Sequence, residues 1–407
     1  MTPEQHAALF DSADPLAEYR ERFILPENVI YLDGNSLGAL PNDTPMKIQR
    51  VVDEEWGRGL IRSWNSAGWF EMASRIGSKI APLIGAAPHE VIACDSTSVN
   101  LFKLIAAALQ MRPGRKVVLS EPGNFPTDLY MIAGLEAQGL AERRLAPCEA
   151  LAEALDGDVA LLMLTHVHYK TGALHDMAAL TRAAHEAGAL VLWDLSHSTG
   201  ALPVDLADAG ADFAVGCGYK YLCGGPGAPA FAFVAERHQA ALQQPLTGWF
   251  GHAAPFVFSD DYIGAPGIAR MQCGTPPVLG LAALEVGVDL IAEIGVDRLY
   301  EKSQALSGFF LDCLKAHRVD LELVSPPRSD ERGSQLSFRA PHAYAICQAL
   351  IARGVIGDFR DPDVLRLGFA PAYLSFADMA SAARHLAEVL VSGEWQRPEF
   401  NQRAAVT

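Results

Sequence analysis

The chain has 407 residues, of which 50% are apolar and 20% charged, so it can bury one large core and a second, smaller one. Its 32 Lys and Arg residues against 48 Asp and Glu residues leave a formal charge of −16, which repels nucleic-acid phosphates and anionic membrane surfaces. We therefore expect a globular protein that acts on a small molecule, with neither nucleic acid nor membrane as a partner.

The cysteines and the N-terminal stretch indicate a cytoplasmic protein. The seven cysteines are scattered and never spaced as CxxC, so we expect reduced thiols rather than a disulfide framework or a zinc knuckle. The stretch "MTPEQHAALFDSADP" is polar and acidic and lacks the regions of a secretion signal. No stretch approaches the length of a membrane span.

Between about residues 90 and 235 the pattern predicts βαβ units with a parallel sheet, because short apolar runs alternate with amphipathic stretches. The predicted strands cover residues 116–120, 159–166, 189–194, 213–217 and 228–234. The predicted helices cover residues 96–112, 125–139 and 176–188, and the last two end on glycine.

A long helical pattern begins after Pro276 and Pro277, which mark a natural hinge. The rest of the chain predicts an α+β arrangement. Its strands cover residues 321–324, 334–339 and 364–369, and its helices cover 343–353 and 375–391.

Polar residues follow the predicted strands, at the edge of an open α/β sheet where ligands bind. Asp194 ends one strand and Lys220 follows the next one. A lysine and a carboxylate at neighbouring strand ends suit pyridoxal phosphate, whose aldehyde forms a Schiff base with lysine while its ring nitrogen needs an anionic partner.

The phosphate of that cofactor needs a cradle of its own. Thr97 and Ser98 stand where helix 96–112 begins and offer hydroxyls, free N–H groups and the positive end of the helix dipole. Phe125 could cover a ring face, and Asp128 or His197 could bond the ring substituents. Three glycines behind Lys220 allow a sharp turn, namely Gly224, Gly225 and Gly227.

Each of these residues also has a purely structural interpretation. A strand-end lysine can extend to solvent, Asp194 can be a cap or an ion-pair partner, and Thr97 with Ser98 can simply cap the helix. His166 and His168 alternate on a strand without a third ligand at zinc spacing, so we treat them as structural and expect no metal site. In chain order, a helix start suited to phosphate is followed by an aromatic ring, an aspartate and a lysine, and this combination favours the cofactor.

Several distinctive motifs are spread over nearly the whole chain. They are "YLDGNSLGALP" (31–41), "SWNSAGWF" (63–70), "NFPTD" (124–128), "WDLSHSTGALPVDL" (193–206), "GCGYKYLCGGPG" (216–227), "GWFGH" (248–252) and "GTPPV" (274–278). In this order they resemble the motifs of the kynureninases. The resemblance implies the fold-type I, aspartate-aminotransferase-like α/β fold of pyridoxal phosphate enzymes, with a mainly parallel seven-stranded sheet. We expect a large cofactor domain (41–278), a smaller C-terminal α+β domain (279–407) and an N-terminal segment (1–40) that packs with the small domain.

The resemblance also implies roles for individual residues. Lys220 would carry the cofactor, Asp194 would pair with its ring nitrogen, and Phe125 would stack on the ring. Pro126, Thr127, Asp128 and His197 would lie near the ring, and Thr97, Ser98 and Tyr219 would hold the phosphate. Trp249 and Thr275 would reach in from a partner subunit, so a homodimer with shared active sites is implied. Ser36, Trp64 and Arg366 would line the substrate pocket, where the fork of Arg366 suits an α-carboxylate.

The activity implied is hydrolysis of L-kynurenine to anthranilate and L-alanine in tryptophan catabolism. Relatives that accept hydroxylated substrate carry asparagine at the position of Thr275 and histidine at that of Trp64, so this chain fits unsubstituted kynurenine, with 3-hydroxykynurenine as a second substrate. Tyr219 is either the general acid or a phosphate ligand only, and Arg366 could instead lie on an exposed strand face.

Two other classes stay open from the residues alone. A cysteine desulfurase or an aminotransferase would share Lys220 and Asp194, but a desulfurase needs a reactive cysteine on a mobile loop, whereas Cys313 and Cys347 fall in helical patterns. A non-catalytic scaffold of this fold usually loses the lysine or adds a DNA-binding module, and neither is seen here.

Overall fold

The computed structural model describes residues 1–403, and its largest feature is a sheet of seven strands. The strands are β4 (Val91–Ala93), β5 (Val117–Ser120), β6 (Glu142–Leu145), β7 (Val159–Thr165), β8 (Leu190–Asp194), β9 (Phe213–Gly216) and β10 (Phe231–Val234). They lie in the order β4-β10-β9-β8-β7-β5-β6. β5 to β9 pair in parallel and only β10 runs the other way, which confirms the mainly parallel sheet. The two outer strands, β4 and β6, were not predicted, because they are short and β6 carries charged residues.

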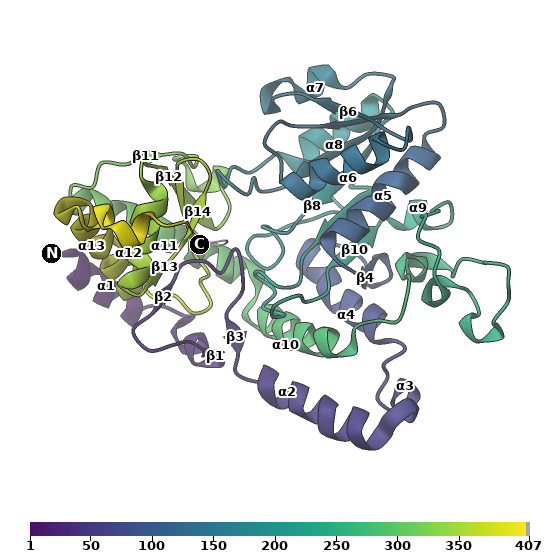
Figure 1. Cartoon of the computed structure of the whole chain (residues 1–407), viewed down its shortest axis with the longest axis horizontal. Helices are drawn as coiled ribbons and strands as arrows, with labels where there is room; N and C mark the ends of the chain where they lie inside the picture. Colours follow the sequence, from purple (N-terminus) through teal and green to yellow (C-terminus); the bar gives the residue numbers. More distant parts are fainter. Residues whose placement is uncertain (404–407) are drawn as a thin grey trace.

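Helices cover both faces of this sheet (Figure 1). Alternate residues of β7 point into different cores: Leu161 and Met163 pack in one with helix α5 (Thr97–Met111), while Leu162 and Leu164 pack in the other. Burial on both faces explains why the central strands read as continuous apolar runs. The further helices of this part are α4 (Met72–Ile80), α6 (Pro126–Glu136), α7 (Leu151–Ala154), α8 (Met177–Glu186) and α9 (Glu236–Gln239).

The long helical pattern after Pro277 forms two helices rather than one. α10 (Val278–Ile294) packs against α4 and against α2 (Thr44–Arg50), and α11 (Val296–Ala316) packs against α13 (Phe376–Ser392). Gly295 separates them with φ +89°, a conformation that side chains with a Cβ rarely adopt. The chain therefore changes direction at Gly295 between the two parts of the molecule.

The C-terminal part has the predicted α+β arrangement, and its sheet is antiparallel. β11 (Glu322–Leu323), β12 (Gln335–Arg339), β15 (Val364–Gly368) and β14 (Asp358–Arg360) lie in this order, with α12 (Ala343–Ala352), α11 and α13 beside them (Figure 1). The short strand β14 was not predicted. It pairs Asp358 directly opposite Arg366 of β15, which matters for the site described below.

The N-terminal segment lies beside this second sheet. α1 (Pro3–Ser12) packs against α13, and β2 (Ile30–Tyr31) pairs in parallel with β13 (Val355–Ile356). The remaining short elements are β1 (Phe23–Ile24), β3 (Leu40–Pro41) and α3 (Ser63–Ser66). The exact domain boundaries stay a prediction. Within residues 1–403, no helix combines the length and the apolar character that crossing a membrane requires.

Candidate active site

A cavity of about 210 Å³ opens at the carboxyl ends of β7, β8 and β9, beside the N-terminus of α5. This is the edge of the sheet where the sequence placed the candidate residues. The predicted residues that line it are Thr97, Ser98, Phe125, Thr127, Asp194, His197, Tyr219 and Lys220.

Lys220 lies inside this cavity and does not extend to solvent. The residue is only 7% exposed, and its Nζ lies 3.1 Å from His197 Nε2. The same nitrogen lies 5.6 Å from the centre of the Phe125 ring. The solvent-exposed alternative for this lysine is therefore wrong, and a buried amine faces the space where a ligand would sit.

Two buried carboxyl groups lie within electrostatic reach of Lys220. Asp194 accepts a hydrogen bond from the Ser196 N–H at 2.8 Å, while neither carboxyl oxygen of Asp128 has a partner among the described residues. Burial raises the pKa of both groups, and the charge of Asp194 raises that of Asp128 further. Unpaired buried carboxylates are costly, so the pair calls for a cationic or hydrogen-donating group in the cavity.

The helix α5 presents hydroxyls to the same cavity. Its N-cap is Ser96, whose side chain accepts from the Val99 N–H at 3.3 Å. Thr97 and Ser98 are therefore not the cap, and both line the cavity at the positive end of the helix dipole. A helix N-terminus with additional hydroxyls suits a phosphate.

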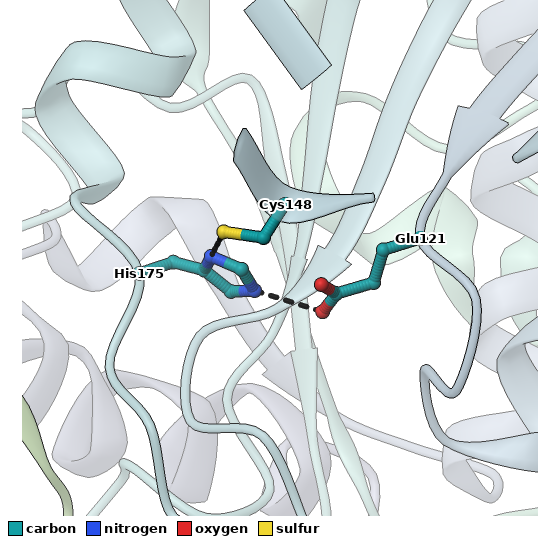
Figure 2. A group of neighbouring side chains, drawn as sticks. All are labelled: Glu121, Cys148 and His175. Carbon is teal, nitrogen blue, oxygen red and sulfur yellow. Dashed lines mark hydrogen bonds and ion pairs between the residues drawn. The ribbon is translucent and has the colours of Figure 1, made fainter. Parts of the chain in front are cut away.

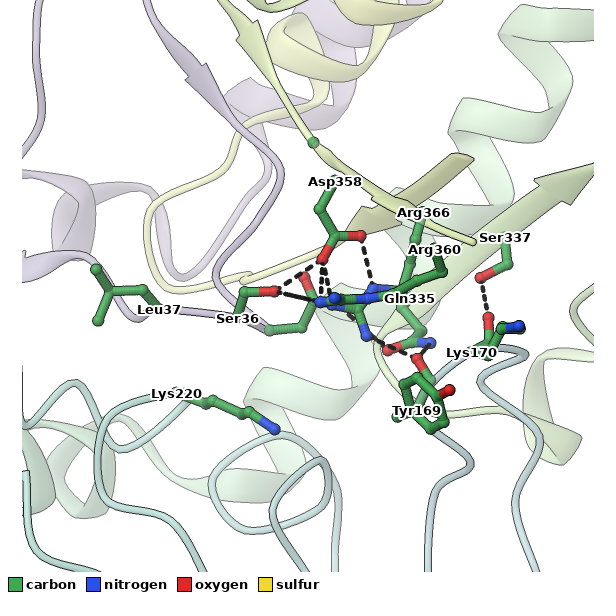
Figure 3. Close-up of polar contacts among 12 residues, drawn as sticks. Ser36, Leu37, Tyr169, Lys170, Lys220, Gln335, Ser337, Asp358, Arg360 and Arg366 are labelled. Atoms are coloured by element: carbon green, nitrogen blue, oxygen red, sulfur yellow. Dashed lines mark hydrogen bonds and ion pairs between the residues drawn. The ribbon is translucent and has the colours of Figure 1, made fainter. Parts of the chain in front are cut away.

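Arg366 and Ser36 come together at a second group of polar residues (Figure 3). Arg366 is 1% exposed, so the exposed-strand alternative for it is wrong. Its Nε donates to Asp358 Oδ1 at 2.8 Å, its Nη2 donates to Ser36 Oγ at 2.8 Å, and its Nη1 donates to the Tyr169 carbonyl at 2.6 Å. Burial, Lys220 and then the charges of Arg366 and Arg360 lower the pKa of His197, which places both guanidinium groups within electrostatic reach of the cavity.

Sequence reasoning missed three residues at or beside this group, namely Tyr169, Asp358 and Arg360. Asp358 bonds Arg366, Arg360 and Ser36, and the two arginines hold its pKa below the usual value although burial acts in the opposite direction. Tyr169 lines the cavity and packs edge-on against Phe125 with ring centres 5.3 Å apart. The polar stretch "VHYKTG" after the strand at 159–166 was a usable signal for Tyr169, whereas nothing local marks Asp358.

Seven predicted residues do not line this cavity, namely Ser36, Trp64, Pro126, Asp128, Trp249, Thr275 and Arg366. Pro126 opens α6 directly after Phe125. Trp64 packs against Phe250 with ring centres 5.5 Å apart. Trp249 is 41% exposed and packs edge-on against the same Phe250 ring, with ring centres 4.7 Å apart. Thr275 is exposed. Within one chain, the structure thus leaves Trp64, Trp249 and Thr275 away from Lys220.

Comparison with known proteins identifies the family. A model described as the kynureninase C-terminal domain matches residues 299–386. A protein named Kynureninase from Burkholderia mallei (strain SAVP1) is 50% identical over 416 residues, covering 100% of both chains. This chain belongs to the kynureninase family. A second kynureninase, from Pseudomonas fluorescens, is 48% identical over 418 residues, again covering 100% of both chains.

Solved structures share the fold of this kynureninase-family chain. The apo cysteine desulfurase of Thermococcus onnurineus NA1 matches with a TM-score of 0.81 at 19% identity, over 92% of this chain and 98% of that one. A C-DES mutant with glycine covalently linked to the PLP cofactor matches with a TM-score of 0.80 at 17% identity, over 90% and 98% of the two chains. The likeness confirms the fold-type I architecture. Cys313 and Cys347 are buried within α11 and α12.

The residues present fit pyridoxal 5'-phosphate, the cofactor of this fold type. The buried polar atoms without a partner among residues 1–403 include both Asp128 oxygens, His197 Nδ1 and Thr165 Oγ1, and of these three residues His197 and Thr165 line the cavity. A ring with a basic nitrogen, a phenolic oxygen and a phosphate supplies the donors and acceptors that these atoms lack. The lining of this cavity therefore fits the cofactor.

Gly38 of the "GNSLG" motif holds the N-terminal segment against the Lys220 turn. Its N–H donates to the Tyr219 carbonyl at 2.8 Å, and an added Cβ would lie 2.2 Å from the Lys220 carbonyl oxygen. We expect Gly38→Ala to cost ~1 to 3 kcal/mol by overpacking and to displace Lys220, so that less cofactor is retained per chain. Absorbance of the bound cofactor after dialysis measures this. Gly134→Ala is the matched control, because nothing lies within 4 Å of its added Cβ; equal cofactor loss in both variants would contradict the prediction.

Proposed function

We propose that this kynureninase-family chain hydrolyses L-kynurenine to anthranilate and L-alanine with pyridoxal 5'-phosphate, and 3-hydroxykynurenine to 3-hydroxyanthranilate as a second reaction. One observation carries the proposal: a buried lysine within electrostatic reach of Asp194 and Asp128 lies in a cavity that the charge of a buried arginine also reaches, in a chain that matches proteins named kynureninase over its full length. The free state of all seven cysteines supports a cytoplasmic location, where thiols stay reduced.

The bound cofactor acts as an electron sink that makes bonds to the substrate carbon bearing the amino group easier to break. Asp194 supports this role, because its charge would keep the cofactor ring nitrogen protonated. Lys220 supplies the amine that moves a proton at the substrate α-carbon, and His197 lies within hydrogen-bond distance of that amine. Because burial and the Lys220 charge lower the pKa of His197, its imidazole stays neutral and can accept a hydrogen bond.

Arg366 is the residue that we expect to bind the substrate α-carboxylate. Four hydrogen bonds, to Asp358 twice, to Ser36 and to the Tyr169 carbonyl, hold the guanidinium in one orientation. A guanidinium has five N–H groups, so one N–H, on Nη1, remains for the substrate in this arrangement. Ser36 Oγ, held between Asp358 and Arg366, lies at the same place and can turn toward the substrate.

Tyr219 remains protonated at neutral pH, because burial and the neighbouring Cys217 raise the pKa of its phenol. A protonated phenol on the cavity wall can donate to a phosphate oxygen or return a proton to the alanine-side carbon. Both roles use the same O–H, and we retain both for Tyr219.

The reaction is tested by incubating purified holoenzyme with L-kynurenine and following anthranilate fluorescence. 3-Hydroxykynurenine and cysteine serve as comparators. We expect anthranilate and an equal amount of L-alanine from kynurenine. Sulfide release from cysteine without cleavage of either kynurenine would replace this function by a desulfurase.

We also propose a homodimer in which Trp249 and Thr275 complete the active site of the partner subunit. The exposure of both residues supports this, as does an exposed apolar group next to Trp249 that comprises Phe256, Val257, Phe258 and Ile263. Monomeric proteins rarely expose an apolar patch of this kind. Light scattering should give twice the mass of the chain.

Mixed dimers test the shared site. Lys220→Ala and Trp249→Ala subunits are each expected to be impaired, because each lacks one part of the site. In a mixed dimer, one of the two sites combines the intact Lys220 of one subunit with the intact Trp249 of the other. Refolding the variants together should restore about one quarter of the wild-type activity. No recovery would show that Trp249 acts within its own chain or not at all.

A further inference from the structure

A second group of side chains with metal-ligand chemistry lies outside the cofactor cavity (Figure 2). Glu121 directly follows β5, Cys148 follows the outer strand β6, and His175 lies between β7 and α8. One ligand atom from each lies within 4.8 Å of those of the other two. The carboxyl ends of three neighbouring strands therefore bring together a thiol, an imidazole and a carboxylate.

The imidazole stands between the other two groups. Its Nε2 lies 2.8 Å from Glu121 Oε1, and its Nδ1 lies 3.5 Å from Cys148 Sγ (Figure 2). With the proton on Nε2, this N–H donates a hydrogen bond to the carboxylate, which leaves the lone pair of Nδ1 on the side of the sulfur. Glu121 and His175 are buried while Cys148 is exposed, so the site is rigid on one side and open to solvent on the other.

We propose that Cys148 Sγ and His175 Nδ1 bind a divalent cation of the zinc class, with Glu121 fixing the imidazole from behind. Zinc bonds of about 2.3 Å to sulfur and about 2.0 Å to nitrogen, at a tetrahedral angle, separate the two ligand atoms by about 3.5 Å. The observed separation is 3.5 Å. A metal-binding histidine characteristically donates its other N–H to a carboxylate, the position that Glu121 occupies.

The electrostatics of the group also favour a cation. Burial raises the pKa of the Cys148 thiol, and the carboxylates of Glu121 and Glu149 raise it further. These charges oppose a free thiolate but attract a divalent ion, which replaces the thiol proton and releases it to solvent as the metal–sulfur bond forms. Water and the exposed carboxylate of Glu149 can fill the remaining positions.

The bound ion would link the segment after the outer strand β6 to the loop that carries His175, and His175 in turn contacts Glu121, where the turn that leads to the cofactor cavity begins. That turn begins at Glu121, whose carbonyl accepts the Asn124 N–H at 3.3 Å, and it ends at Phe125 on the cavity wall. An ion that binds the folded chain only stabilises it by mass action. The site is independent of the reaction proposed above.

Equilibrium dialysis of chelator-treated holoenzyme against Zn²⁺ tests the site, together with the ultraviolet charge-transfer band that Cd²⁺ forms with a thiolate. We expect about one equivalent of Zn²⁺ per chain, a Cd²⁺–thiolate band and a higher unfolding midpoint with Zn²⁺. Cys148→Ser should abolish the band and the stabilisation. Glu121→Gln should weaken Zn²⁺ affinity about 10- to 100-fold while keeping the Cd²⁺ band.

Cys273→Ser is the matched control, since this partly exposed cysteine lies outside the group. It should keep both the band and the zinc equivalent. Cys148 is exposed, so its serine variant is expected to fold, and bound-cofactor absorbance verifies this. Zinc uptake and a Cd²⁺ band that persist in Cys148→Ser would overturn the proposal. Wild-type holoenzyme that binds no Zn²⁺ would equally overturn it and leave the three residues as a hydrogen-bonded chain.

Discussion

Lys220→Ala is expected to reduce anthranilate formation from L-kynurenine to background and to prevent borohydride from trapping the cofactor on the chain. The amine of Lys220 is the buried nitrogen that faces the cavity, so no neighbouring side chain replaces it. Loss of its proton-transfer role alone lowers the rate about 10²- to 10⁴-fold. The fluorescence assay measures the rate, and the mass of the borohydride-treated chain measures trapping.

Lys170→Ala is the control for this prediction. Lys170 lies near the Arg366 group, but its Nζ donates to the Asp361 carbonyl at the surface, at 2.6 Å. The variant should retain trapping, with the modified peptide containing Lys220. Trapping that survives in Lys220→Ala would move the covalent link to another residue and remove the basis of the proposed function.

Arg366→Ala is expected to raise KM for L-kynurenine about 100-fold, which corresponds to about 3 kcal/mol for a buried, charge-assisted contact. The substitution also leaves the buried Asp358 with Arg360 as its remaining cationic partner, so it can destabilise the fold. Arg366→Lys is therefore the second variant: it keeps a positive charge beside Asp358 but loses the planar fork, so it should raise KM and lower the unfolding midpoint less than Arg366→Ala does.

Arg360→Ala separates the substrate contact from general electrostatics. Arg360 contacts the same Asp358 and Ser36, but its side chain is partly exposed. Its loss should raise KM less than the loss of Arg366. An unchanged KM in both Arg366 variants, with folded protein and bound cofactor, would exclude this arginine from the substrate pocket.

The cofactor side of the site was predictable because its residues follow consecutive parallel strands. Asp194 and Lys220 end or follow β8 and β9, and parallel strands bring their carboxyl ends to one edge of a sheet. The helix start at Thr97 and Ser98 could be found for the same reason. Local pattern sufficed here, because the order of strands in a βαβ series follows from few topological rules.

The substrate side was predictable only through family resemblance. Ser36 and Arg366 are separated by 330 positions and meet because the N-terminal segment crosses to the second sheet. Asp358, which bonds both, lies on a three-residue strand that is too short for a hydrophobic pattern to predict. The buried Asp358 and Arg366 and the partly exposed Arg360 are stable there only as a mutually paired set, and no single segment of the sequence shows that pairing.

The sequence by itself determined the mainly parallel sheet, the strand-end chemistry and the family, because hydrophobic period, turn residues and motif order are local properties of the chain. Only the tertiary structure decided which polar residues share a site. It buried Arg366 against Asp358, took Trp64 and Trp249 away from the cavity of their own chain, and assembled Glu121, Cys148 and His175. The physical reason is that contacts between distant segments depend on how whole elements pack. The spacing of residues along the sequence does not show which elements will pack together.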